Sequence, residues 1–266
     1  MEFVTMPRSK LKDIQSEFDE RNIPINQVGV KDISYPVMVL DKLGGEQHTV
    51  ARVNMYVDLP HNFRGTHMSR FIEILNRYQS GISTKKIREI LDDMQKSLNA
   101  EDAFFEIQFP YFITKSAPIS KESAKMEYIC RLVGESSVDY YTLEVKVPVL
   151  SLCPCSKEIS RYGAHNQRSI ITIQIKAAEK IWIEDIVAIA ETSASSDLYS
   201  ILKREDEKHI TEKSFENPMF VEDMVRSVAE KLTNLEGVRW FSVESENMES
   251  IHNHSAYARI VRSVKK

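Results

Sequence analysis

Apolar and polar residues alternate over long stretches of this chain. In residues 53–59 every second position is Val, Met or Leu, and the run stops at Pro60. The same period of two recurs in residues 105–111, 143–149 and 171–175. Alternate side chains of a strand point to opposite faces, so these stretches predict half-buried strands, most simply antiparallel ones.

Other segments follow the helical period. Residues 83–98 place apolar side chains three and four positions apart, and Ser83 or Thr84 is the expected N-cap. A later apolar stripe follows Pro218, where we expect Asn217 to cap the helix and the proline to fill its first position. Each stripe predicts a helix with one face packed on the sheet.

The predicted elements repeat in order. The first half predicts strands at about 34–41 and 48–59, helices at 67–78 and 83–98, and strands at 103–115 and 126–135. The second half predicts strands at about 138–150 and 169–177, helices at 183–194 and 218–233, and strands at 237–245 and 255–263. This doubled ββααββ order predicts an α+β protein with an antiparallel sheet and helices on one face. We expect a variable tail at 1–22, a first unit at 23–136 and a second at 137–266.

Composition and charge narrow the class of protein. Of 266 residues, 42% are hydrophobic and 28% are charged, as in ordinary globular proteins. The net charge of -4 argues against a general affinity for nucleic acid or an anionic membrane. No apolar run reaches the ~20 residues that span a bilayer, and the amino terminus lacks a signal-peptide pattern. We therefore expect a cytoplasmic protein without nucleic-acid or membrane partners.

Three cysteines, an odd number, do not form a disulfide framework. Cys130 lies in an apolar strand, where it is expected only to pack. Cys153 and Cys155 flank Pro154 directly after a predicted strand, and His165 follows. The C-x-C-x9-H spacing does not match a structural zinc module. An open metal site with mixed ligands, a Cys/His nucleophile pair and a turn with two packed cysteines all stay open at this point.

Two charged segments favour the metal. One is "LKREDEKHITE", in the long stretch 195–218 between the second-half helices, and the other is "SVESENMESIHNHSAY" near the carboxyl end. Their candidate ligands are Glu205, Asp206, Glu207, His209, Glu244, Glu246, Glu249, His252 and His254. Taken alone, the first segment also fits a solvated charged turn. Together they supply the carboxylates and imidazoles that a mixed-ligand site requires.

With these segments in view, the sequence resembles the type I-B GTP cyclohydrolases. The resemblance rests on "NIPINQVGVKDISYPV", "GTHMSRF", "SLCPCSKEISRYGAHNQRS", "DLYSILKREDEK", "ENPMFVEDMVR" and "VESENMESIHNHSAY", in that order. It implies the tandem tunnelling fold, assembly into barrels and a homotetramer with shared active sites. It also implies conversion of GTP to 7,8-dihydroneopterin triphosphate and formate, the first step of folate biosynthesis.

The resemblance carries roles onto particular residues. It makes Cys153, His165 and Glu207 ligands of one divalent transition metal, whether manganese, iron or zinc, and a metal-activated water attacks C8 of GTP. It makes His252 a proton donor or relay and gives Cys155 a place beside the metal. Glu222 would grip N1 and the exocyclic amine of guanine. The candidate triphosphate ligands are Arg70, His67, Lys157, Arg168, Lys203, Arg204 and Lys208.

Two alternatives accompany this interpretation. The first is the metal-free, tunnelling-fold nitrile reductase of queuosine biosynthesis, which uses a cysteine and NADPH. The second is a non-catalytic metal-binding scaffold, in which the cysteine loop serves only folding. Stoichiometric metal and turnover of GTP distinguish the cyclohydrolase from both.

Overall fold

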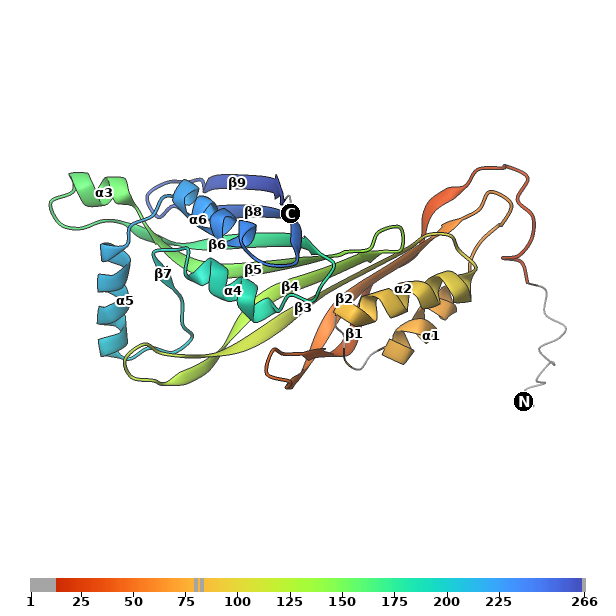
Figure 1. Cartoon of the computed structure of the whole chain (residues 1–266), viewed down its shortest axis with the longest axis horizontal. Helices are drawn as coiled ribbons and strands as arrows, with labels where there is room; N and C mark the ends of the chain where they lie inside the picture. The colour runs from red at the N-terminus through yellow and green to blue at the C-terminus, as the bar shows by residue number, and fades with distance from the viewer. Residues whose placement is uncertain (1–12, 79–80, 82–83, 265–266) are drawn as a thin grey trace, which may run out of the picture.

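The alternating stretches form one continuous antiparallel sheet in the computed structural model, which describes residues 13–78, 81 and 84–264 (Figure 1). Its strand order is β1-β2-β3-β4-β5-β6-β8-β9, and the short β7 pairs with β5. None of the helices in the described ranges is long and apolar enough to cross a membrane. The predicted α+β class with an antiparallel sheet is confirmed.

The elements have the following bounds. The first half contains β1 (Ile25–Leu40), β2 (Glu46–Leu59), α1 (Met68–Tyr78), α2 (Thr84–Leu98), β3 (Ala103–Ser116) and β4 (Ser123–Glu135). The second half contains β5 (Tyr141–Leu152), α3 (Pro154–Ile159), β6 (Asn166–Ala177), α4 (Ile183–Glu191), β7 (Ser196–Asp197), α5 (Arg204–Glu216), α6 (Val221–Thr233), β8 (Val238–Asn247) and β9 (Ala256–Ser263).

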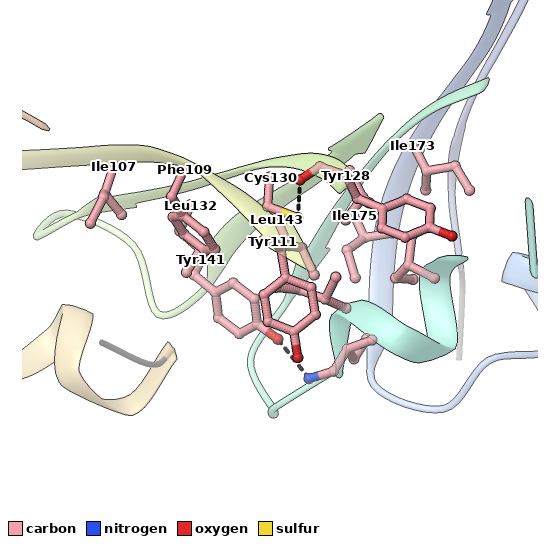
Figure 2. Packing of buried hydrophobic residues seen from close by; sticks show 14 of the residues in the cluster. Ile107, Phe109, Tyr111, Tyr128, Cys130, Leu132, Tyr141, Leu143, Ile173 and Ile175 are labelled. Carbon is pink, nitrogen blue, oxygen red and sulfur yellow. Dashed lines mark hydrogen bonds between the residues drawn. The ribbon is translucent and has the colours of Figure 1, made fainter. Parts of the chain in front are cut away.

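The core lies on one face of this sheet. Ile107 is paired with Leu132, Leu132 with Leu143, and Leu143 with Ile175, and all four side chains are buried. Directly paired residues share a face, so the period of two seen in the sequence aligns across the strands. Helices α1 and α2 pack on the first half of the sheet, and α4 and α6 pack on the second. Figure 2 shows these strand side chains from close by.

Helix α4, in the second half of the chain, is hydrogen-bonded to strands of the first half. Tyr111 of β3 donates a hydrogen bond to Glu184 at 2.6 Å, and Tyr128 of β4 donates one to Glu191 at 2.8 Å. Burial and the acceptor carboxylates raise the pKa of both phenols, which keeps them in the donating form. One sheet and one core therefore run through both units.

Strands β3 and β4 continue beyond their neighbours as a long hairpin. By backbone pairing, β2 accompanies β3 as far as Gln108, and β5 accompanies β4 from Ile129 onward. The remaining part, residues 109–128, is called the arm below. It reaches the second unit, where Lys115 lies 2.8 Å from Glu191 and 2.9 Å from Asp197.

Several predicted boundaries were wrong. Asn217 does not cap α6: it is the C-cap of α5, and its backbone N–H donates to Lys213 at 3.1 Å. Pro218 precedes α6, whose first turn is instead closed by a bond from the Phe220 N–H to the Asp223 carboxylate at 3.0 Å. Ser83, the other suggested cap, lies outside the described residues. The stretch 195–218 was read as a loop, and it contains β7 and α5.

Candidate active site

Residues 153–165 connect β5 to β6 and are called the cysteine loop below. Backbone hydrogen bonds close this loop. The Cys153 N–H donates to the His165 carbonyl at 3.1 Å, and the His165 N–H donates to the Ser156 hydroxyl at 3.2 Å. Pro154 occupies the first turn of α3, where a missing N–H costs nothing, and Cys153 is the N-cap, with Sγ accepting from the Ser156 N–H at 3.5 Å. The loop therefore holds Cys153 and His165 next to each other.

The three cysteines differ in environment. Cys130 is fully buried in the core, as predicted, and burial raises the pKa of its thiol, which keeps it neutral and unreactive. Cys153 is half-buried and Cys155 is exposed. Neither residue of the loop is a core filler, so the interpretation as a turn with two packed cysteines was wrong.

Gln167 orients the His165 ring. Its Oε1 lies 3.0 Å from Nδ1 of His165, while its Nε2 donates to the Ser151 hydroxyl at 2.8 Å and to Glu249 at 3.3 Å. Because the amide nitrogen is engaged by two acceptors, the amide oxygen must face the imidazole and accept the Nδ1 proton. This tautomer leaves the lone pair on Nε2, the arrangement that a metal-binding histidine requires.

Glu249 completes this partly buried polar group. Its Oε2 lies 3.8 Å from Nδ1 of His165, and the two side chains are 14% and 15% exposed. The sequence placed Glu249 in a cluster of possible ligands without giving it a role, and it did not single out Gln167 or Ser151. Only the pairing of β5 with β6, which sets Ser151 opposite Gln167, brings them together.

The β8–β9 loop carries His252 to the same end of the molecule. The Met248 N–H donates to the Arg168 carbonyl at 3.1 Å, which places the loop beside the start of β6. His252 is exposed and stacks on His254, with ring centroids 5.0 Å apart. His252 is therefore an exposed imidazole at the end of the molecule that carries His165.

Glu222 lies exposed on the first turn of α6. The Met219 N–H donates to the Leu152 carbonyl at 3.1 Å, so the start of α6 is tied to the residue that precedes Cys153. A carboxylate at a helix N-terminus is stabilised by the helix dipole. Glu222 thus belongs to the same end of the molecule as the cysteine loop.

Glu207 is separated from the cysteine loop. Near that loop, Nζ of Lys157 lies 4.5 Å from the Phe215 ring centroid, close to the end of α5. Glu207 precedes Phe215 by eight residues, which is about 12 Å along a helix. Within 13–78, 81 and 84–264, no three His, Cys, Asp or Glu side chains gather as a metal site. One chain therefore brings together Cys153 and His165 and not the third predicted ligand.

The predicted triphosphate cations are also dispersed. Arg168 is exposed near the cysteine loop, and Lys203, Arg204 and Lys208 are exposed in the first part of α5 or just before it.

His67 and Arg70 lie at the start of α1, and Figure 1 places α1 and α3 toward opposite ends of the long axis. There His67 lies 3.2 Å from the Asp13 carboxylate, and Arg70 donates to the Ser97 carbonyl at 3.2 Å. A single chain does not bring these cations to the cysteine loop.

Comparison with solved structures identifies the fold. The chain is similar to a hyperthermostable mutant of Bacillus sp. TB-90 urate oxidase, with a TM-score of 0.50 and 11% identity over 90% of this chain and 98% of that chain. It is equally similar to a highly active BTUO mutant, with a TM-score of 0.50 and 10% identity over 90% and 100%. These likenesses show the tunnelling fold, as predicted.

Residues 11–258 match the model of the type I GTP cyclohydrolase FolE2 family, and the chain belongs to that family. It is 56% identical to the GTP cyclohydrolase FolE2 of Geobacter sp. (strain M21) over 97% of both chains. It is 58% identical to that of Geotalea uraniireducens (strain Rf4) over 95% of this chain and 93% of the relative. The predicted enzyme class, a GTP cyclohydrolase, is confirmed, and the nitrile reductase and scaffold alternatives lose their support.

Proposed function

We propose that this chain is a type I-B GTP cyclohydrolase, acting in the cytoplasm, that converts GTP to formate and 7,8-dihydroneopterin triphosphate for folate biosynthesis. The observation that carries the proposal is the Cys153–His165 pair, held by one backbone bond and oriented by Gln167, in a chain of the GTP cyclohydrolase family. The free thiols agree with a reducing compartment.

A divalent transition metal fits the chemistry of the proposed donors. Cys153 offers a thiolate, His165 offers Nε2 and Glu207 offers a carboxylate, a mixed set suited to manganese, iron or zinc. When bound, such a metal lowers the pKa of a coordinated water and so makes a nucleophile available at neutral pH. Because α5 carries Glu207 away from the cysteine loop, we assign this third ligand to a neighbouring copy of the chain.

The guanine base is recognised by Glu222. A carboxylate with both oxygens free accepts two parallel N–H bonds, here from N1 and the exocyclic amine. Adenine offers no such pair of donors, so the same carboxylate excludes it. The exposed position of Glu222 on the first turn of α6 leaves its oxygens open to the base.

Opening of the imidazole portion of guanine requires protons at ring nitrogens. His252 is suited to deliver them because an imidazole can both donate and accept a proton. Its backbone N–H donates to the Glu249 carbonyl at 3.4 Å, which joins its loop to the group around His165. The exposure of Cys155 on the first turn of α3 supports a role beside the metal, as a hydrogen-bond partner of its water or as an alternative ligand.

A homotetramer with shared sites would bring these separated residues together. Lys157 and Arg168 lie at the cysteine-loop end, whereas His67 and Arg70 lie at the α1 end. Packing the α1 end of one copy against the cysteine loop of another would gather cations for three phosphates. Exposed apolar side chains at the cysteine-loop end, Ile159 at 85% and Tyr162 at 88%, provide surface for such a contact.

The proposed function is tested by incubating purified protein with GTP and manganese, oxidising the product and measuring pterin fluorescence. We expect fluorescence from the wild type and a loss in Cys153→Ala that exceeds the roughly 10- to 100-fold cost of losing an outer contact of a ligand, because the thiolate ligand itself is gone. Cys130→Ala is the matched control, a buried thiol without a role in turnover. Equal turnover in Cys153→Ala and the wild type would overturn the ligand assignment.

A further inference from the structure

Asp206, the residue before Glu207, is held by four donors. It is fully buried although Glu205 and Glu207 on either side are exposed. Its Oδ1 accepts from the backbone N–H groups of Ile119 at 2.8 Å and Ser120 at 2.9 Å. Its Oδ2 accepts from the Ser120 hydroxyl at 2.6 Å and from the Lys203 N–H at 2.8 Å. These contacts are called the Asp206 clasp below.

The clasp joins the two units of the chain. Ile119 and Ser120 lie in the turn at the tip of the arm, which the Ala117 N–H closes on the Glu122 carbonyl at 2.8 Å. Lys203 directly precedes α5 of the second unit. Figure 1 shows the turn between β3 and β4 reaching the end of α5 that is farther from α3. The first unit therefore holds the helix that carries Glu207.

A carboxylate is the side chain that suits this position. Every group that faces Asp206 in the clasp is a donor, and its two oxygens accept two hydrogen bonds each. An asparagine has one carbonyl oxygen, so its amide N–H groups would face two donors. The clasp is therefore specific for aspartate at a helix position where Asn is otherwise tolerated.

Helix α5 depends on such polar contacts because it buries little apolar surface. Its buried residues are Asp206 and Ser214. Farther along, Nζ of Lys213 lies 2.8 Å from Asp197, and Nδ2 of Asn217 donates to the Ala194 carbonyl at 2.9 Å. The contacts at Lys213 and Asn217 hold the second half of α5, whereas the clasp, with a 4.0 Å ion pair between Lys203 and Glu122 beside it, holds the turn on which Glu207 lies.

We propose that Asp206 is a positioning residue for Glu207, and that the tip of the arm sets the direction of the Glu207 carboxylate. Successive side chains on a helix point about 100° apart, so fixing Asp206 against the arm also fixes the direction of Glu207, whose side chain is exposed. This inference rests on the proposed function, in which Glu207 binds the metal of a neighbouring copy. The tunnelling-fold unit that lacks the cysteine loop thereby takes part in building the site.

The test uses Ser120→Ala, which removes the hydroxyl donor and keeps the aspartate. Ser123→Ala is the matched control, because Ser123 is exposed on the same hairpin and its hydroxyl bonds Ser116 at 2.9 Å and the Lys121 carbonyl at 3.4 Å, and not Asp206. Ser120→Thr restores a hydroxyl and serves as the rescue. Each oligomeric protein is titrated with cobalt(II), and its hydrogen exchange is followed over residues 204–216.

We expect Ser120→Ala to bind cobalt about tenfold more weakly and to change the cobalt absorption spectrum, as for lost support of a ligand. Amide exchange in the first turns of α5 should become faster, while Ser123→Ala and Ser120→Thr match the wild type. Asp206→Asn should show the same effects more strongly. If Ser120→Ala and Ser123→Ala bind cobalt with equal affinity, the positioning role of Asp206 is overturned, even if the Ser120→Ala protein is less stable.

Glu207→Gln separates this inference from the proposed function. If Glu207→Gln binds cobalt as the wild type does, Glu207 is not a ligand and the proposed metal site fails. If Glu207→Gln weakens cobalt binding and Ser120→Ala does not, the proposed site stands and the clasp is overturned. If both weaken it and the threonine rescues Ser120→Ala, both are supported.

Discussion

The amide oxygen of Gln167 lies 3.0 Å from Nδ1 of His165, and this contact decides which nitrogen of the ring is available to a ligand. The amide nitrogen is engaged by Ser151 and Glu249. These two bonds fix the orientation of Gln167, so the ring cannot turn without breaking the hydrogen bond between Nδ1 and the amide oxygen.

Replacing Gln167 should weaken metal binding without removing a ligand. In Gln167→Leu the ring loses its acceptor, and we expect a 10- to 100-fold weaker affinity for manganese, the usual effect of losing such an outer contact. The measurement is a manganese titration of the purified protein. Gln108→Leu, on the exposed side of β3, is the control and should bind normally. Unchanged affinity in Gln167→Leu would refute the orienting role.

Replacing Glu222 should impair recognition of the base and spare the metal. We expect Glu222→Gln to lower kcat/KM for GTP by at least 100-fold, because the amide offers only one acceptor to two donors. Manganese affinity should stay at the wild-type value. Glu230→Gln, exposed farther along α6, is the control. Steady-state kinetics with GTP check this, and normal kinetics in Glu222→Gln would exclude the assigned role.

The ion pairs of Asp197 predict a loss of stability in acid. Burial opposes the charge of this carboxylate, and the bonds from Lys213 and Lys115 outweigh it, so the pKa of Asp197 lies below its ordinary value of 3.8. A carboxylate whose pKa is lower in the folded state than in the unfolded state stabilises the fold at a pH above its unfolded-state pKa. This stabilisation is lost as the pH falls below about 4. We therefore expect the free energy of unfolding to fall steeply in that range.

Asp197→Asn should lose about 3 kcal/mol of stability at pH 7, because Lys115 and Lys213 each lose a charge-assisted hydrogen bond to Asp197, although Lys115 keeps its pair with Glu191. Its stability should then vary less with pH below 4 than that of the wild type. Asp139→Asn is the control: its carboxylate is 93% exposed and 3.7 Å from Arg88, and it should change stability by less than about 0.5 kcal/mol. Denaturant unfolding at several pH values measures both. Parallel pH curves for Asp197→Asn and the wild type would contradict the assignment.

The sequence predicted most of the fold because an element that is buried on one face has apolar residues at regular spacing. Strands such as β3 and β5 show the period of two, and α6 shows an apolar stripe. Helix α5 shows neither: it is held by Asp206 and Lys213 and not by an apolar face, so its sequence reads as a charged turn.

The site was predictable only in part. The pairing of Cys153 with His165 follows from a short loop between adjacent strands, and local spacing indicates it. The roles of Gln167 and Glu249 depend on the register of β5 with β6 and on a distant loop, which no local pattern encodes. The distance of Glu207 from the cysteine loop is a property of the folded chain.

The central claim is that active sites form between copies of this chain, and complementation of two inactive variants tests it most directly. Cys153→Ala and Glu207→Gln oligomers are prepared separately, then dissociated and reassembled together with GTP and manganese. A site that takes Cys153 from one copy and Glu207 from another is intact in about one quarter of random pairings. We predict that pterin fluorescence recovers to about that fraction of the reassembled wild type. If the mixture stays as inactive as its parents while reassembled wild type is active, Cys153 and Glu207 do not act across a subunit boundary.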